Sequence, residues 1–279
     1  MTTENLVALG TLPNAPLVLV LAQVRFLPSM QYNLDAMREH VCRSLATEFP
    51  NVSPVYAFNV QLGGVFGQNL PPTQQTLMGF ELRSADQRSV IRLSPDSITL
   101  AVSSYTNFED FMGIWSKALA PLKDAGVAHV QRVGLRYVDF IYPSAGRLPE
   151  DYFVAPFDYR GFASATGATD VAQTNAHIQE YPFEQGRMRV QYARGIGQPT
   201  LPVELQGLLE VTSIHARPVV QGATAIFDTD RWIDSQRPSD LASLRDDFDL
   251  LHTGVSDAFK QFATQKAIDE WSTPRDAAV

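Results

Sequence analysis

Apolar runs and amphipathic stretches alternate along the chain and predict a succession of strands and helices. Residues 17–26, with the sequence LVLVLAQVRF, are almost continuously apolar and lie between prolines, as expected for a central strand. From Asn33 to Phe49, apolar side chains recur at spacings of three and four, which predicts an amphipathic helix capped by Asn33. A second helix is predicted from Asn107 to Asp124. Four short strand candidates lie between the two helices, at residues 55–62, 76–83, 89–93 and 98–103.

The order of elements begins again at Val127. A long strand is predicted at residues 129–142, an irregular aromatic stretch at 152–162 replaces the first helix, and a final amphipathic helix is predicted at 239–271. Further strand candidates lie at residues 172–183, 187–194, 205–216 and 223–227. The pattern predicts the α+β class, with antiparallel sheets and packing helices in two helix-grip-like pseudo-repeats. These would be an N-terminal α+β half at residues 1–126 and a C-terminal α+β half at 127–279 that ends in a long helix.

Composition and charge narrow the classes of function. The 279 residues carry 22 Lys and Arg against 30 Asp and Glu, a net charge of −8, which disfavours nucleic acid as a partner. Apolar residues make up 45% and charged residues 19%, as in a soluble globular protein. Cys42 has no second cysteine, which excludes a disulfide scaffold. Residues 1–15 lack the basic start of a secretory signal, and the apolar run at 15–22 is too short for a membrane span, so we expect a cytoplasmic protein without a membrane partner.

Four short motifs, spread over most of the chain, carry a resemblance to a protein family. They are the NAPL sequence at residues 14–17, GLRY at 134–137, DTD at 228–230 and the LH pair at 251–252. Together they resemble a sporadically distributed prokaryotic family of uncharacterised proteins of similar length. The resemblance implies no activity. The patchy distribution of such a family is typical of mobile or defence-related genes.

Two groups of residues are candidates for catalysis. His252 lies on the predicted final helix with Asp249 three residues before it, so the two could form an acid-oriented base, or His252 could simply border the apolar face. Asp228 and Asp230 could share a cation or raise the pKa of one another, or they could be solvated acids in a turn. No two histidines have the spacing of a helical metal pair, and we predict neither a metal site nor a cofactor.

Arg25 and Arg136 are candidates for ligand binding, together with the neighbouring Tyr137. Each arginine interrupts an otherwise apolar predicted strand, where a guanidinium is costly unless it is paired. The partner could be an internal carboxylate, such as that of Asp139 or Glu81, or the carboxylate or phosphate of a ligand. The glycine-rich loop at 63–67 and the aromatic stretch at 152–162 are interpreted as a turn and as a segment packed over a cavity mouth.

No catalytic pattern is stronger than its structural alternative. The leading hypothesis is therefore a non-catalytic protein that binds a small anionic or amphipathic ligand or a protein partner, with the oligomeric state left open. The alternative is a hydrolase or nuclease that uses His252 with Asp249, or Asp228 with Asp230. A third hypothesis is an RNA-processing protein with tandem sheet domains.

Overall fold

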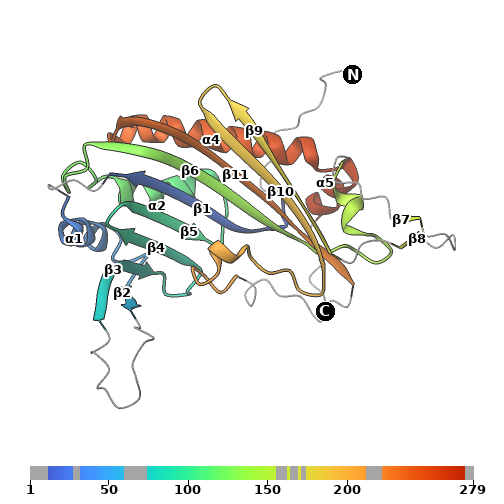
Figure 1. Cartoon of the computed structure of the whole chain (residues 1–279), viewed down its shortest axis with the longest axis horizontal. Coiled ribbons are helices and arrows are strands. Elements are labelled where there is room, and N and C mark those ends of the chain that lie inside the picture. Colours follow the sequence, from blue (N-terminus) through green and yellow to red (C-terminus); the bar gives the residue numbers. More distant parts are fainter. Residues whose placement is uncertain are drawn as a thin grey trace, which may run out of the picture.

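The fold is one continuous antiparallel sheet with helices on one face (Figure 1). The computed structural model describes residues 12–27, 32–59, 74–154, 162–163, 169–170, 174–211 and 222–273. Within these residues, nine strands form the main sheet, which confirms the predicted α+β class. In their order across the sheet, the strands are β2 (Asn51–Asn59), β3 (Gln74–Arg83), β4 (Ser89–Ser94), β5 (Ser97–Val102), β1 (Leu17–Phe26), β6 (His129–Ile141), β11 (Ala223–Pro238), β10 (Gly186–Ile196) and β9 (Asn175–Phe183). Two short strands pair separately, β7 (Phe162–Ala163) and β8 (Thr169–Asp170).

Strands β1 and β6 pair at the centre of the sheet and join the two predicted halves. Outward from this pair, the first half contributes β1, β5, β4, β3 and β2, and the second contributes β6, β11, β10 and β9. In each half the first strand is central and the last strand lies beside it. Pseudo-repeats would produce this shared order, but duplication and the two units at 1–126 and 127–279 stay predictions.

The helices begin at side-chain caps. Asn33, Asn107, Asp240 and Thr264 each accept a backbone N–H bond in the first turn. The helices are α1 (Leu34–Ser44), α2 (Phe108–Leu119), α4 (Leu241–Phe262) and α5 (Gln265–Ser272), with 3-10 turns η1 (Pro149–Tyr152) and η2 (Val203–Leu205). No helix in the described ranges has the length and hydropathy needed to cross a membrane.

Two apolar clusters lie on the helix-covered face of the sheet. The larger one joins α1, α2 and the first half of α4 to strands from both halves of the sheet, including β1 and β6. The smaller one joins the end of α4, α5 and η1 to β10 and β11. Figure 1 shows α4 running along the sheet, with α1 and α5 towards opposite ends of the molecule. A third cluster lies on the opposite face, where residues 201–211 cover Val138 and Phe140.

The structure corrects three predicted elements. Residues 205–211 do not form the predicted strand: they contain the end of η2, a turn and a loop that packs on the opposite face of the sheet. Strand β11 extends to Pro238, well beyond the predicted end at 227, because it pairs with β6 over nearly its whole length. The predicted final helix is two helices, since Ala263 leaves the helical conformation and Thr264 caps α5. The loop at 63–67 and most of the aromatic stretch lie outside the described residues.

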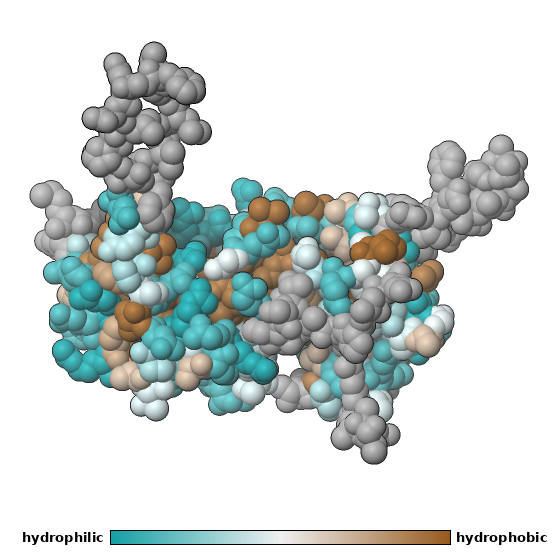
Figure 2. All heavy atoms as spheres, turned by 90° about the horizontal axis from the view of Figure 1, so that it is seen from below, coloured by the Kyte–Doolittle hydropathy of each residue, from teal (hydrophilic) through white to brown (hydrophobic). Residues whose placement is uncertain are grey.

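Both edges of the sheet carry exposed apolar side chains. On β2 and β3 these include Val52, Tyr56 and Met78, and on β9 they are Ile178 and Phe183. Each edge strand also contains a proline, at positions 54 and 182, which cannot donate a ladder hydrogen bond and so discourages pairing with another chain. Figure 2 shows a mostly hydrophilic face on which apolar residues gather in a band across the middle.

Gly254 of α4 makes room for the side chain of Arg231 from β11. The buried Arg231 of β11 donates from its Nη1 to the carbonyl of Leu250 at 2.6 Å, and its side chain fills the space beside Gly254. A Cβ at position 254 would overlap this guanidinium, whereas a Cβ at Gly113 of α2 would meet nothing. The lack of a side chain at 254 therefore leaves the space that the Arg231 guanidinium occupies beside α4.

We expect Gly254→Ala to lower the free energy of unfolding by about 1–2 kcal/mol, because overpacking outweighs the better helix propensity of alanine. Gly113→Ala is the matched control, and it should stabilise the protein by up to about 1 kcal/mol. Urea unfolding of the two variants and the wild type measures both effects. A gain in stability for both variants would contradict the close contact at Gly254.

Candidate functional site

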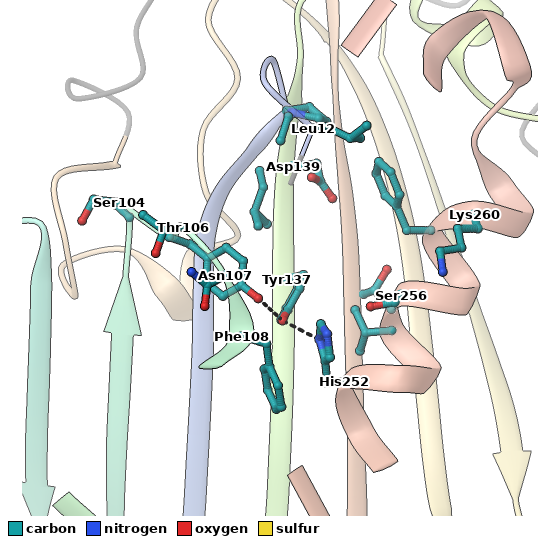
Figure 3. A pocket seen from close by; sticks show the side chains of 18 of the residues that line it. Leu12, Ser104, Thr106, Asn107, Phe108, Tyr137, Asp139, His252, Ser256 and Lys260 are labelled. Atoms are coloured by element: carbon teal, nitrogen blue, oxygen red, sulfur yellow. Dashed lines mark hydrogen bonds between the residues drawn. The ribbon is translucent and has the colours of Figure 1, made fainter. Parts of the chain in front are cut away.

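A pocket of about 1160 Å³ opens between the sheet and the second half of α4 (Figure 3). Its floor is formed by β6 and β11, and one wall is formed by α4 residues 252–260. Residues 12–17 and the loop before α2, residues 103–108, form the other sides. The backbone N–H of Asn14 donates to the carbonyl of Trp271 at 2.9 Å, which ties the first of these segments to α5.

The alternation of side chains along β6 places the pocket between the two clusters of the helix-covered face. Leu135 and Tyr137 pack with the larger cluster, and Ile141 belongs to the smaller one. Asp139 occupies the position between them and is 4% exposed. One carboxyl group thus interrupts a row of apolar side chains, and it lines the pocket.

Three side chains from three elements form a hydrogen-bonded chain in the pocket. The Tyr137 hydroxyl lies 2.9 Å from Nδ1 of His252 and 3.2 Å from the hydroxyl of Tyr105. The ring of Phe108 stacks on the imidazole at 4.0 Å between centroids. The Tyr137 hydroxyl has one proton, so it can donate only one of these two hydrogen bonds. It accepts the other bond when the neighbouring group carries the proton. Figure 3 shows Tyr137 at the centre of this chain.

Burial keeps this chain uncharged near neutral pH. It raises the pKa of Tyr137 and that of Tyr105 above the ordinary tyrosine value. Burial lowers the pKa of His252, an effect that Lys260 reinforces and Asp249 opposes. Two phenols and a neutral imidazole therefore present hydrogen-bonding groups without charge.

Asp139 and Thr229 have no partner for their side chains among the described residues. Among the described residues, no hydrogen bond or ion pair reaches the carboxyl of Asp139, which is 4% exposed. The Thr229 hydroxyl is buried without a hydrogen bond. Burial, together with the nearby Asp228 carboxylate, raises the pKa of Asp139 well above its usual range. Buried polar groups are normally satisfied, so these two are the candidates for contact with a bound molecule or with water.

The remaining charged groups of the pocket lie on its outer walls. Arg88 and Asp257 are exposed and Lys260 is half-buried. In Figure 3, Lys260 and Ser256 come from α4, across the pocket from the loop that carries Ser104 and Thr106. The walls thus carry two cationic side chains, Arg88 and Lys260, and one acidic side chain, Asp257. The floor carries the carboxyl group of Asp139.

Of the predicted ligand-binding residues, only Tyr137 lines the pocket. Arg136 points to the opposite face of the sheet, is 6% exposed, and donates to Asp228 at 2.8 and 2.6 Å and to Glu204 at 2.8 Å. Its partner is thus an internal carboxylate, as one alternative expected, but Asp228 fills this role instead of Asp139 or Glu81. Arg25 is half-exposed, 3.7 Å from Asp96.

The predicted catalytic pairs are engaged elsewhere. His252 lies in the pocket, but Asp249 pairs with Arg245 at 3.0 Å, and the hydrogen bond of His252 goes to Tyr137. Asp228 and Asp230 lie inside β11, on one side of it, and not in a turn. Asp228 is bound by Arg136, and Asp230 lies 3.5 Å from Arg189. Within the described ranges, no group of three His, Cys, Asp or Glu residues could hold a metal ion.

Sequence reasoning did not identify Asp139, Thr229 or Tyr105 as site residues. Asp139 had one signal, which is its place in the alternate row Val133, Leu135, Tyr137, Asp139 and Ile141, where every other member is hydrophobic or aromatic. Thr229 and Tyr105 had none, because threonine is ordinary in a strand and tyrosine in a loop. Their role depends on what the fold brings beside them.

No protein-family model matches the chain, and neither the curated proteins nor the solved structures contain a significant match. The geometry of the pocket is therefore the basis on which its function is inferred.

Removing Arg136 should be costly. Arg136→Met leaves Asp228 buried without its cation, and we expect a loss of about 3–5 kcal/mol in the free energy of unfolding. Arg25→Met is the matched control, and it should cost less than about 1 kcal/mol because its ion pair is exposed. Chemical unfolding of both variants checks this, and equal small losses would contradict a structural role for the Arg136 pair.

Asp139→Asn should stabilise the ligand-free protein at neutral and alkaline pH. Because the folded-state pKa of Asp139 is raised, its contribution to stability is present below the unfolded pKa of about 3.9 and is lost as pH rises through the folded value. The Tm advantage of the variant should therefore grow between pH 5 and pH 8. Asp246→Asn, at an exposed position of α4, is the control and should show no such trend. A variant less stable than the wild type at pH 8 would contradict an uncompensated carboxyl.

Proposed function

We propose that this protein binds a small amphipathic ligand in the pocket between β6, β11 and α4, without chemical turnover. The observation that carries the proposal is a pair of buried groups that have no hydrogen-bond partner among the described residues. They are the Asp139 carboxyl and the Thr229 hydroxyl, and both lie in a largely apolar cavity. Small-molecule sites combine apolar walls with a few polar groups that fix orientation. This pocket has that composition.

The size and the framework of the pocket support binding. Its volume of about 1160 Å³ lies just above the range of about 300–1000 Å³ that is usual for small-molecule sites, so a small ligand fits with room to spare. Tyr137, Asp139 and Thr229 lie on central strands, and His252 lies in a 22-residue helix. Polar groups on such rigid elements are held in place before a ligand arrives, which lowers the entropic cost of binding.

The contacts give less support to hydrolase or nuclease activity. A histidine that acts as an acid-oriented base needs a carboxylate hydrogen-bonded to its imidazole. His252 is hydrogen-bonded to the phenol of Tyr137 instead, and Asp249 is bound by Arg245. A cation bound by Asp228 and Asp230 would have to compete with Arg136 and Arg189. The neutral His252 could still act as a base on a bound ligand, and the detection of product in the experiment below would reveal that activity.

Native mass spectra of the purified protein, compared with spectra after denaturation, test the proposal. We expect a bound mass of a few hundred daltons that disappears on denaturation. Asp139→Asn and Tyr137→Phe should reduce the occupied fraction about tenfold, since the first removes the charge of a buried carboxylate and the second removes a buried hydroxyl. Asp246→Asn should keep the wild-type occupancy.

An empty protein that also gains no thermal stability from a library of small amphipathic molecules would refute the proposal. Extra mass equal to a second polypeptide would point to a protein partner instead. A bound mass that is equally abundant in all variants would place the ligand outside this pocket.

A further inference from the structure

The two unpartnered groups of the pocket lie close enough together to serve one ligand atom. Thr229 pairs with Tyr137 across the β6–β11 ladder, and Asp139 pairs with Phe227. Asp139 and Thr229 are therefore diagonal neighbours on one face of an antiparallel pair, at about 7–8 Å between backbones, a separation that a group held between the two side chains can bridge. Both side chains are more than nine-tenths buried and line the pocket.

We infer that the pocket selects ligands that carry a primary ammonium group, which Asp139 and Thr229 hold at its floor. This inference rests on the proposed function and deepens it by naming the chemistry of the ligand. An ammonium group has three donors and no acceptor, so it matches a carboxylate and a hydroxyl oxygen that both lack a donor.

The other side chains around the floor also favour a cation. Tyr105, Tyr137 and Phe259 line the pocket, and aromatic faces attract an ammonium group. The cations of the lining, Arg88 and Lys260, lie on the outer walls, so an anionic group of the same ligand would be held there and not at the floor.

The energetics of Asp139 agree with this assignment. A carboxylate in this environment is unfavourable on its own, and an opposite charge beside it removes much of the penalty. Binding of an ammonium should thus draw Asp139 into its ionised form. A neutral alcohol or an anion offers no such compensation.

Isothermal titration calorimetry at pH 7.5 with three probes of equal chain length tests the inference: octylammonium chloride, 1-octanol and sodium octanoate. We expect the wild type to bind octylammonium at least tenfold more tightly than either of the other two. Asp139→Asn should reduce this preference to about twofold or less, and Thr229→Val should reduce the affinity for octylammonium about threefold to tenfold. Asp246→Asn should behave as the wild type.

Loss of binding in Asp139→Asn cannot be attributed to unfolding if the variant is, as expected, the more stable protein. Equal or tighter binding of octanol or octanoate, or an unchanged preference in Asp139→Asn, would overturn the ammonium assignment while leaving a ligand-binding pocket in place. If none of the probes binds, the ammonium assignment is wrong. If the native mass spectra also show no retained molecule and the amphiphile library is inactive, the proposed function fails with it.

Discussion

The pairing of β1 with β6 is the interaction on which the rest of the structure depends. It joins the strands of the first half to those of the second in one hydrogen-bonded sheet. The large apolar cluster extends across this junction, so side chains from α2 and α4 pack on the same central strands. The pocket lies just beyond that cluster, and its walls come from both halves of the chain. Neither half alone contains the complete set of lining residues.

Local signals in the sequence were sufficient to predict most helices and strands of the fold. Asn33 and Asn107 cap helices where the periodicity predicts them, and the apolar runs of β1 and β6 are strands. The end of β11 was not predictable, because the mostly polar residues 228–237 break the apolar pattern. Pairing with β6, and with β10 as far as Trp232, keeps them in a strand. The apolar residues within 205–211 were read as a strand, but their side chains cover the opposite face of the sheet.

The candidate site was predicted only in part. Tyr137 and His252 stood out as residue types with useful chemistry, and both lie in the pocket. Arg136 stood out for its burial cost, but the carboxylate that meets this cost is 92 positions away in the sequence. Asp139 and Thr229 matter because no side chain in the described part of the protein is bonded to theirs. The lack of a partner is a property of the folded arrangement, and a single sequence does not encode it in any local pattern.

The bond from Asn14 to Trp271 has a consequence for how the protein is made. The pocket needs residues 12–17 on one side, and this segment is anchored to a helix that ends at Ser272. A nascent chain can pair β1 with β6 long before α5 has left the ribosome. The wall formed by residues 12–17 gains its anchor only when translation has passed Trp271. Competence to hold a ligand should therefore arise only after residue 271 has been added, later than the pairing of β1 with β6.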